Sequence, residues 1–363
     1  MKAINHEVDG HGRPARFLSA PPHRVVVVRA LPGLGDFLCA VPALRTLRQM
    51  LPAACIDLVG LSATRSLVER FSRYVDRLIS FPGFPGIIEQ PEPVEALPAF
   101  LTRMHRQPYD LALQMHGDGS VSNIFTLLLG ARRTAGFYLP ANHCPDRATF
   151  LPYPQHLHEI RRNLALIQFL GAKGSDETLE FPLTAADQDE FQQLVQEHGL
   201  QPGRYVCIHA GAKDAARRWS PDSFASAIRM MRSKGLQIVL TGTSGDQQAN
   251  NALLRRLQEP PVDLGGQTSL GALALLLQNA RLLLCNDTGV SHLAAATQTP
   301  SVVIFMTSEP QRWAPLNAAR HIAVGSGAGD EVPPGDVLAA LQTLLNRADR
   351  PSALANEART IVH

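Results

Sequence analysis

The sequence lacks any apolar run long enough to cross a membrane, which takes roughly 20 residues. The longest candidate, 270–285, is interrupted by Gln278, Asn279 and Arg281. The first 23 residues are polar and lack the apolar core of a secretory signal. We therefore expect a cytoplasmic protein.

Cysteine spacing and net charge argue against further classes of protein. The five cysteines show no CxxC spacing, so neither a disulfide framework nor a thiolate metal site is indicated, and a reducing compartment follows. The net charge is +2, too mild for a nucleic-acid-binding protein. The charge is uneven, because residues 1–178 hold 19 Lys+Arg against 15 Asp+Glu and the remainder holds 15 against 17. A basic N-terminal half permits contact with an anionic substrate or membrane surface.

Strand-like and helix-like patterns alternate along the chain, which indicates βαβ units on parallel sheets. We expect an α/β protein with two Rossmann-like domains, residues 24–175 and 183–346, that face each other across a central cleft. A flexible arm (1–23), a linker (171–182) and a tail (347–363) complete the division. A Pro/Gly-rich loop, 82–95, interrupts the first domain, and a polar loop extends to about residue 155. The expected strands are 25–29, 56–60, 77–81, 111–115 and 134–136, then 205–209, 237–241, 262–264, 281–285, 301–305 and 321–324.

A carboxylate follows the first buried strand. Gly33 and Gly35 form a turn, and Asp36 stands at the start of the next helix, at the strand end where open α/β sheets bind ligands. Asp36 could cap the helix, bind a ligand or accept a proton. His116 begins the turn after another strand, and we group it with Gly33 and Gly35 at this edge of the sheet.

The loop 209–219 concentrates positive charge. Gly211 allows a ligand to approach the backbone, while Lys213, Arg217 and Arg218 offer donors to phosphate oxygens. The alternative is a solvated basic loop. For Trp219, packing on the next helix is the preferred interpretation.

The segment 282–297 places Asp287, Thr288 and Gly289 before a helix, and free N–H groups at a helix N-terminus bind anions. His292, one turn further, could bond the same group. Alternatively, Asp287 holds the loop and His292 is a buried structural histidine. The Asp-Thr-Gly triplet of aspartic proteases is not indicated, because no second triplet exists and a helix pattern follows.

A third turn contains Gly242 and Asp246, which could accept hydrogen bonds from ribose hydroxyls or simply begin a helix. No GxGxxG follows the first strand, which argues against a dinucleotide-dependent oxidoreductase. The sole Asp-x-Asp, 187–189, opens a helix, so we expect no metal and no other cofactor.

Together these segments resemble the heptosyltransferase family of lipopolysaccharide synthesis, glycosyltransferase family nine. The resemblance covers roughly residues 25–325 and is most specific in the Asp-Thr-Gly-x-x-His segment. It implies a GT-B fold and inverting, metal-independent transfer of a heptose from ADP-heptose to a lipid-linked lipopolysaccharide-core glycan. The segments that carry it are 35–52, 112–137, 209–225, 238–246 and 265–305.

The resemblance also implies roles for residues. Asp36 matches the family's general base. Arg217 matches a basic residue that is Lys in many members. Asp246 matches the acidic residue that lies near the ribose. Residues 287–289 and His292 match the phosphate-binding segment. An enzyme of this kind works at the cytoplasmic face of the inner membrane, with peripheral attachment permitted. A non-catalytic nucleotide-sugar-binding scaffold and a nucleotide-sugar epimerase of similar fold are the alternatives, and the oligomeric state is left open.

Overall fold

The computed structural model describes residues 21–90 and 95–348. It divides into two compact units, residues 1–178 and 179–363, and the boundary falls within the segment 171–182. The predicted arm, 1–23, and tail, 347–363, lie almost entirely outside the described residues.

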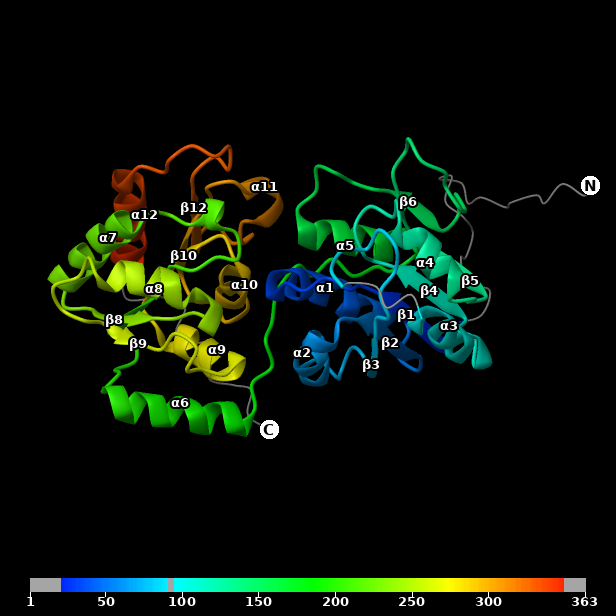
Figure 1. Cartoon of the computed structure of the whole chain (residues 1–363), viewed down its shortest axis with the longest axis horizontal. Coiled ribbons are helices and arrows are strands. Elements are labelled where there is room, and N and C mark those ends of the chain that lie inside the picture. The colour runs from blue at the N-terminus through cyan, green and yellow to red at the C-terminus, as the bar shows by residue number, and fades with distance from the viewer. Residues whose placement is uncertain (1–20, 91–94, 349–363) are drawn as a thin grey trace, which may run out of the picture. The chain divides into compact units, whose positions relative to one another are not determined.

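The N-terminal unit contains a six-stranded parallel sheet with the strand order β3-β2-β1-β4-β5-β6 (Figure 1). Its central strand, RVVVV, is rich in β-branched residues and buried on both faces, as parallel strands covered by helices require. The elements are β1 (Arg24–Val28), α1 (Leu34–Met50), β2 (Cys55–Gly60), η1 (Ser62–Thr64), α2 (Arg65–Arg70), β3 (Arg77–Ser80), α3 (Ala96–Arg106), β4 (Leu111–Gln114), α4 (Ser122–Leu128), β5 (Arg133–Tyr138), β6 (Phe150–Pro152) and α5 (Glu159–Phe169).

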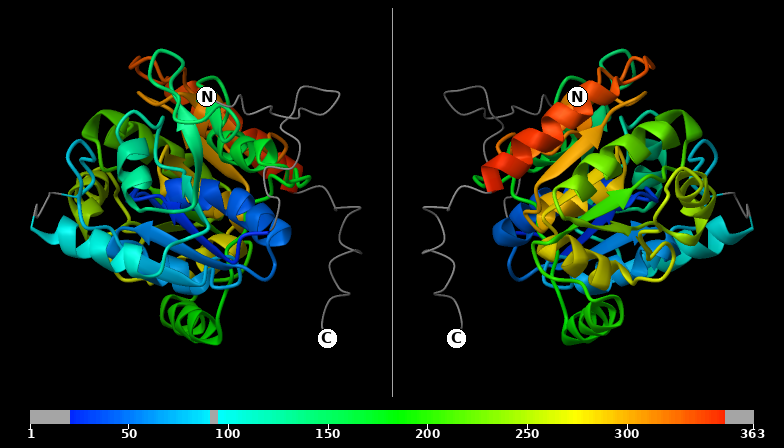
Figure 2. Two further views of the ribbon diagram at one scale, coloured as in Figure 1. Left: turned by 90° about the vertical axis from the view of Figure 1, so that its right-hand side faces the viewer. Right: turned by 90° about the vertical axis from the view of Figure 1, so that its left-hand side faces the viewer.

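The C-terminal unit repeats this topology, with the order β12-β11-β10-β7-β8-β9. Figure 2 shows the sheets and their covering helices from two further sides. The predicted α/β class with two Rossmann-like halves is therefore confirmed. The elements are α6 (Ala185–His198), β7 (Tyr205–His209), η2 (Ala215–Arg217), α7 (Pro221–Ser233), β8 (Gln237–Leu240), η3 (Ser244–Asp246), α8 (Gln247–Leu254), β9 (Val262–Asp263), α9 (Leu270–Asn279), β10 (Leu282–Asn286), α10 (Gly289–Ala296), β11 (Ser301–Ile304), α11 (Pro310–Trp313), β12 (His321–Val324) and α12 (Pro334–Ala348).

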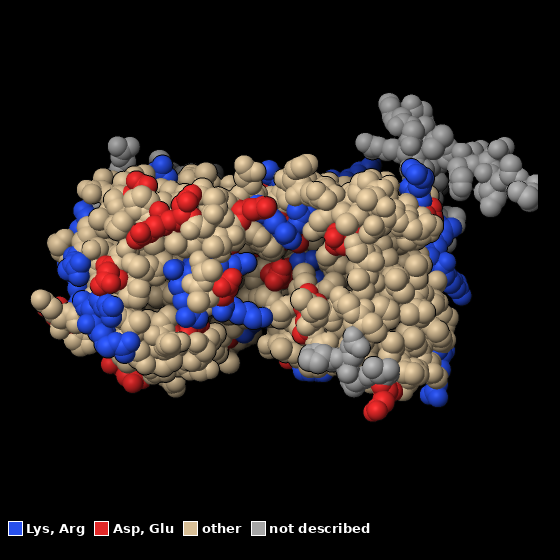
Figure 3. All heavy atoms as spheres, turned by 45° about the horizontal axis from the view of Figure 1, so that its top comes forward, with Lys and Arg blue, Asp and Glu red and all other residues tan. Residues whose placement is uncertain are grey.

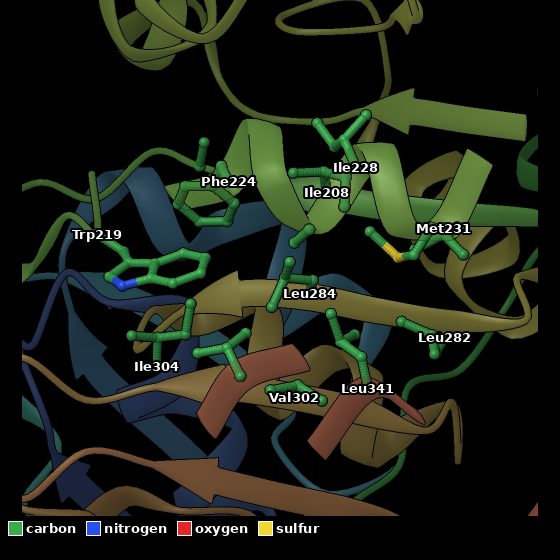
Figure 4. Packing of buried hydrophobic residues seen from close by; sticks show 14 of the residues in the cluster. Ile208, Trp219, Phe224, Ile228, Met231, Leu282, Leu284, Val302, Ile304 and Leu341 are labelled. Atoms are coloured by element: carbon green, nitrogen blue, oxygen red, sulfur yellow. The ribbon is translucent and has the colours of Figure 1, made fainter. Parts of the chain in front are cut away.

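The core of the C-terminal unit forms where α7 and α12 cover one face of this sheet (Figure 4). Trp219 is buried there, its ring edge-on to Phe224 with centroids 5.1 Å apart. Its indole Nε1 donates to the carbonyl of Val332 at 2.8 Å, so this buried donor is satisfied. The packing role predicted for Trp219 is confirmed.

In each sheet the strand order reverses direction at one point, between β1 and β4 and between β7 and β10. Loops that leave the carboxyl ends of such a strand pair diverge, and the space between them is where open α/β sheets bind ligands. Asp36 and His116 follow β1 and β4, and the segments 210–219 and 287–292 follow β7 and β10. The topology thus collects the predicted residues at one edge of each sheet.

Some local predictions need correction. The polar loop before residue 155 contains the short strand β6, and α11 was not anticipated. Pro42 lies inside α1, in its third turn. Ser269 caps α9, accepting from the backbone N–H of Ala272 at 3.1 Å. Within residues 21–90 and 95–348, no helix is long and apolar enough to span a bilayer.

His321 at the start of β12 makes the stability of the C-terminal unit depend on pH. Its side chain is buried, with Nδ1 2.8 Å from the hydroxyl oxygen of Ser301. Burial, assisted by the charge of Arg320, lowers the pKa of His321 to about 4. Between pH 6.5 and about 4 the unfolded state therefore binds more protons than the folded state, and acidification lowers the free energy of unfolding.

We expect His321→Asn to flatten this dependence, removing a loss of up to about 3 kcal/mol over that range. Urea unfolding followed by tryptophan fluorescence measures it, because both tryptophans, Trp219 and Trp313, lie in the C-terminal unit. If the free energies of unfolding of the wild type and the variant changed equally with pH, His321 would not be the source of this dependence.

Candidate active site

Asp36 occupies the first turn of α1, and Gly33, not Asp36, is the N-cap of this helix. Gly33 has an extended backbone and provides no side-chain cap. A Cβ built on Gly33 would lie only 2.2 Å from Oδ2 of Asp36. The partly exposed carboxylate thus folds back over the glycine, and any larger residue at position 33 must displace it.

Arg29, directly after β1, fixes the backbone around Asp36. Its buried guanidinium donates to the carbonyl oxygens of Asp36 and Met115, each at 2.7 Å. It also donates to Asn163 Oδ1 at 3.2 Å and lies 3.6 Å from the carboxylate of Glu159. A buried charge is tolerated only when it is paired and hydrogen-bonded. Arg29 therefore connects the ends of β1 and β4 with α1 and α5.

His116 adjoins the same turn from β4. Its Nδ1 accepts from the backbone N–H of Ala30 at 3.2 Å, which leaves the proton of the neutral ring on Nε2. That nitrogen lies 3.5 Å from Oε2 of Glu89, in the predicted 82–95 loop. Burial lowers the pKa of His116, while the Glu89 carboxylate opposes this effect. The structure thus brings His116 and the Gly33–Asp36 turn together and adds an unpredicted carboxylate.

On the C-terminal unit, Asn286 at the end of β10 secures the basic loop. Its amide nitrogen donates to the carbonyl of Ala210 at 2.8 Å, and its Oδ1 accepts from the backbone N–H of Trp219 at 2.9 Å. One buried side chain therefore holds both ends of the segment 210–219.

Asp287 is buried and committed to protein contacts. Its carboxylate accepts from the Ser308 hydroxyl at 2.5 Å and lies 3.7 Å from Nη1 of Arg217. Burial raises the pKa of Asp287, and the contacts with Ser308 and Arg217 oppose this. Asp287 thus orients Arg217, whose side chain remains partly exposed. Of the other cations in the loop, Arg218 donates to the carbonyl of Ala212 at 2.9 Å, and Lys213 is exposed.

Thr288 is the N-cap residue of α10, but its side chain makes no capping hydrogen bond. Its Oγ1 is buried and has no hydrogen-bond partner among the described residues. Such an unsatisfied donor requires an explanation, and this one lies beside Gly289, where the first N–H groups of α10 favour an anion. His292 is buried one turn later, with its ring edge-on to Trp313.

Asp246 lies at the third turn. Its Oδ2 accepts from both the backbone N–H and the hydroxyl of Thr243, at 2.8 and 2.7 Å, in a capping box. Gly242 has a φ of +150°, and a Cβ on Gly211 would lie 2.0 Å from Oδ1 of Asp246. The turns after β7 and β8 therefore meet at Asp246, which begins a helix. Its contact with a ribose stays a prediction.

These arrangements coincide with a family match. The family model for glycosyltransferase family 9 (heptosyltransferase) matches residues 98–331, more than half of the chain. The chain belongs to this family. The protein is therefore a glycosyltransferase, and the resemblance drawn from the sequence is confirmed. The matched range contains the whole C-terminal site and His116, and Asp36 lies before it.

Individual relatives and solved structures agree with this family membership. Lipopolysaccharide heptosyltransferase 3 of Escherichia coli K12 is 26% identical over 293 residues, covering 77% of this chain and 82% of that protein. The structure of a family 9 glycosyltransferase from Veillonella parvula superposes with a TM-score of 0.74 at 19% identity, covering 90% and 97% of the two chains. The structure of E. coli ADP-heptose lipopolysaccharide heptosyltransferase II superposes with a TM-score of 0.67 at 21% identity, covering 89% of this chain and 99% of that chain. These structural neighbours confirm the GT-B fold class.

Four residues of the family 9 enzyme's site escaped the sequence reasoning. Arg29 and Asn286 end buried strands, and a polar residue at that position was a usable signal. Glu89 and Ser308 lie in loops and are more than 20 residues from their partners, so the sequence contained no signal for either contact. In the part of the chain that the structure describes, no cluster of three or more His, Cys, Asp or Glu could hold a metal. Asp187, from the Asp-x-Asp, is instead engaged in a capping box with Thr184.

Gly33→Ala tests whether the position of the Asp36 carboxylate matters. The added methyl collides with Oδ2, and a displacement of about 1 Å costs about 100-fold in turnover. We expect that loss in a glycosyl-transfer assay, with the thermal unfolding midpoint nearly unchanged. Gly335→Ala is the control, since a Cβ there meets nothing within 4 Å. Wild-type turnover in Gly33→Ala would show that this geometry is irrelevant.

Proposed function

We propose that the enzyme transfers a heptose from ADP-heptose to a lipid-linked glycan of the lipopolysaccharide-core type, with inversion and without a metal. The observation that carries the proposal is the unsatisfied Thr288 hydroxyl at the N-terminus of α10, close in the chain to Asp287, which orients Arg217. This is a site for a diphosphate. The name of the E. coli neighbour, an ADP-heptose heptosyltransferase, supports the donor.

The C-terminal unit would stabilise the leaving group. As the bond from the anomeric carbon to the diphosphate oxygen breaks, negative charge grows on ADP. The N–H groups of α10 and the hydroxyl of Thr288 would donate to these oxygens, and Arg217 with Lys213 would supply positive charge. Preorganised donors of this kind do the work that a metal ion does in other transferases.

The N-terminal unit would activate the acceptor. Asp36 would accept the proton of the acceptor hydroxyl as its oxygen bonds to the anomeric carbon, on the side opposite the departing ADP. The partial exposure of Asp36 supports this role, since a base must reach a substrate. His116 and Glu89 border the same edge and would contact the acceptor. The mechanism requires the two sheet edges to face each other around donor and acceptor.

A lipid-linked acceptor places the reaction at the cytoplasmic face of the inner membrane. The positive balance of residues 1–178, 19 basic against 15 acidic, supports peripheral attachment there.

Asp36→Asn tests the base. The amide keeps the size of the side chain but cannot accept the proton, and we expect turnover to fall by about 10²- to 10⁴-fold with donor affinity retained. Transfer from ADP-heptose gives the first quantity and calorimetric titration with ADP the second. Asp336→Asn is a matched control, because Asp336 also follows a glycine in the first turn of a helix, α12. Wild-type turnover in Asp36→Asn would exclude the assignment.

Metal independence has its own test. Because Arg217, Lys213 and α10 would carry the charge of the leaving group, EDTA should leave the initial rate of transfer unchanged. The measurement is the rate before and after chelation, with Mg²⁺ then added back. A loss of rate that Mg²⁺ restores would overturn this part of the proposal.

A further inference from the structure

The N-terminal unit contains a cavity of about 550 Å³ between strand β3 and the C-terminal end of α3. Arg24 and Arg77 are the first residues of β1 and β3, and Tyr109 precedes β4. The cavity therefore begins at the amino ends of the strands, whereas Asp36 and His116 follow their carboxyl ends. It is separate from the candidate active site.

The lining of this cavity has an excess of positive charge. It includes the four arginines Arg24, Arg77, Arg103 and Arg106. Only Arg77 has a carboxylate partner among the described residues, forming two hydrogen bonds of 2.9 and 2.8 Å with the buried Asp57. Four guanidinium groups against one carboxylate leave an excess of three positive charges, and guanidinium groups bind phosphate oxygens in a bidentate manner.

Hydrogen bonds and a cation–π contact hold some of the side chains of this cavity in place. The hydroxyl of Tyr109 donates to Asp57 at 2.6 Å, and burial together with this bond raises the pKa of Tyr109. The guanidinium of Arg24 lies 4.7 Å from the centroid of the Tyr109 ring and donates to the carbonyl of Gln107 at 2.8 Å. Two of the arginines are therefore fixed in place, and Met104 and Ile79 add apolar surface.

The neighbouring helix α4 exposes an apolar face. Ile124, Leu127 and Leu128 are 55%, 48% and 42% exposed, and their spacing puts them on one side of the helix. The helix packs beside α3, since His105 Nε2 lies 2.8 Å from the carbonyl oxygen of Leu128. Contiguous exposed apolar surface next to a basic region is typical of a membrane-binding face.

We propose that the α3–α4 layer docks onto an anionic lipid bilayer, with a lipid phosphate in the arginine-lined cavity and the apolar face of α4 entering the interface. Figure 3 also shows basic side chains along the edge of this unit at the right of the picture. Charge attracts the layer to anionic headgroups, and the leucines and isoleucine of α4 add apolar burial. The inference rests on the proposed membrane-linked acceptor and names the surface that meets the membrane.

Vesicle co-sedimentation of the full chain tests the docking, with phosphatidylcholine alone and with added phosphatidylglycerol. We expect binding only with phosphatidylglycerol, weakened by salt. Arg103→Gln with Arg106→Gln should lower the partition coefficient about 25-fold, and Leu127→Ser should lower it further. Arg229→Gln with Arg232→Gln, the same spacing at the end of α7, should leave it unchanged.

Other outcomes refute the docking. These are absence of vesicle binding, equal binding to both vesicles, or equal loss in the α7 control. Calorimetric binding of glycerol 1-phosphate without vesicle binding would make the cavity a site for a soluble phosphate. Self-association abolished by Leu127→Ser, seen by light scattering, would make the α4 face a contact between copies.

The two proposals fail separately. Vesicle binding requires neither donor nor acceptor, and transfer is measured in parallel with a delipidated, soluble core acceptor. A protein that transfers but does not bind vesicles refutes only the docking. One that binds vesicles but does not transfer refutes only the proposed function. Circular dichroism of each variant establishes that it is folded.

Discussion

The strands β1 and β10 are buried on both faces and carry polar side chains only at their ends, and this constraint arranges the candidate site in both units of the enzyme. Within β1 and β10 every central side chain is apolar, so the first polar groups appear as each strand leaves the sheet. In the N-terminal unit that group is Arg29, and in the C-terminal unit it is Asn286. Each is buried and hydrogen-bonded to the loops around it. Desolvation makes these contacts stringent, because a buried donor without a partner is costly.

The two aspartates of the site have different environments. Asp287 is buried, and its carboxylate is engaged with Ser308 and near Arg217. It thereby orients the guanidinium of Arg217. Asp36 is partly exposed, and its carboxylate lies against Gly33. The same functional group is therefore buried and paired with other side chains in one unit and partly exposed in the other.

Glycine provides space at both edges. At Gly33 and at Gly211 a single added carbon would collide with a carboxylate oxygen. Neither residue has a positive φ, so the requirement comes from the neighbouring aspartate and not from the backbone. From the sequence alone both glycines were interpreted as turn residues or as room for a ligand. The packing shows that each one primarily makes room for an acid.

The sequence by itself determined the alternation of strands and helices, the two similar halves and the position of most elements. It also placed the segments around Asp36, Arg217 and residues 287–289 at strand ends. These features depend on local apolar periodicity and on caps such as Ser269, which are encoded within a few residues. The strand β6 was missed because it follows a polar loop and ends in Pro152, a residue that strands disfavour. Only the tertiary structure decided which side chains meet: Arg29 with Asn163, 134 residues apart, or His116 with Glu89. Such contacts depend on how whole elements pack, and no local pattern records them.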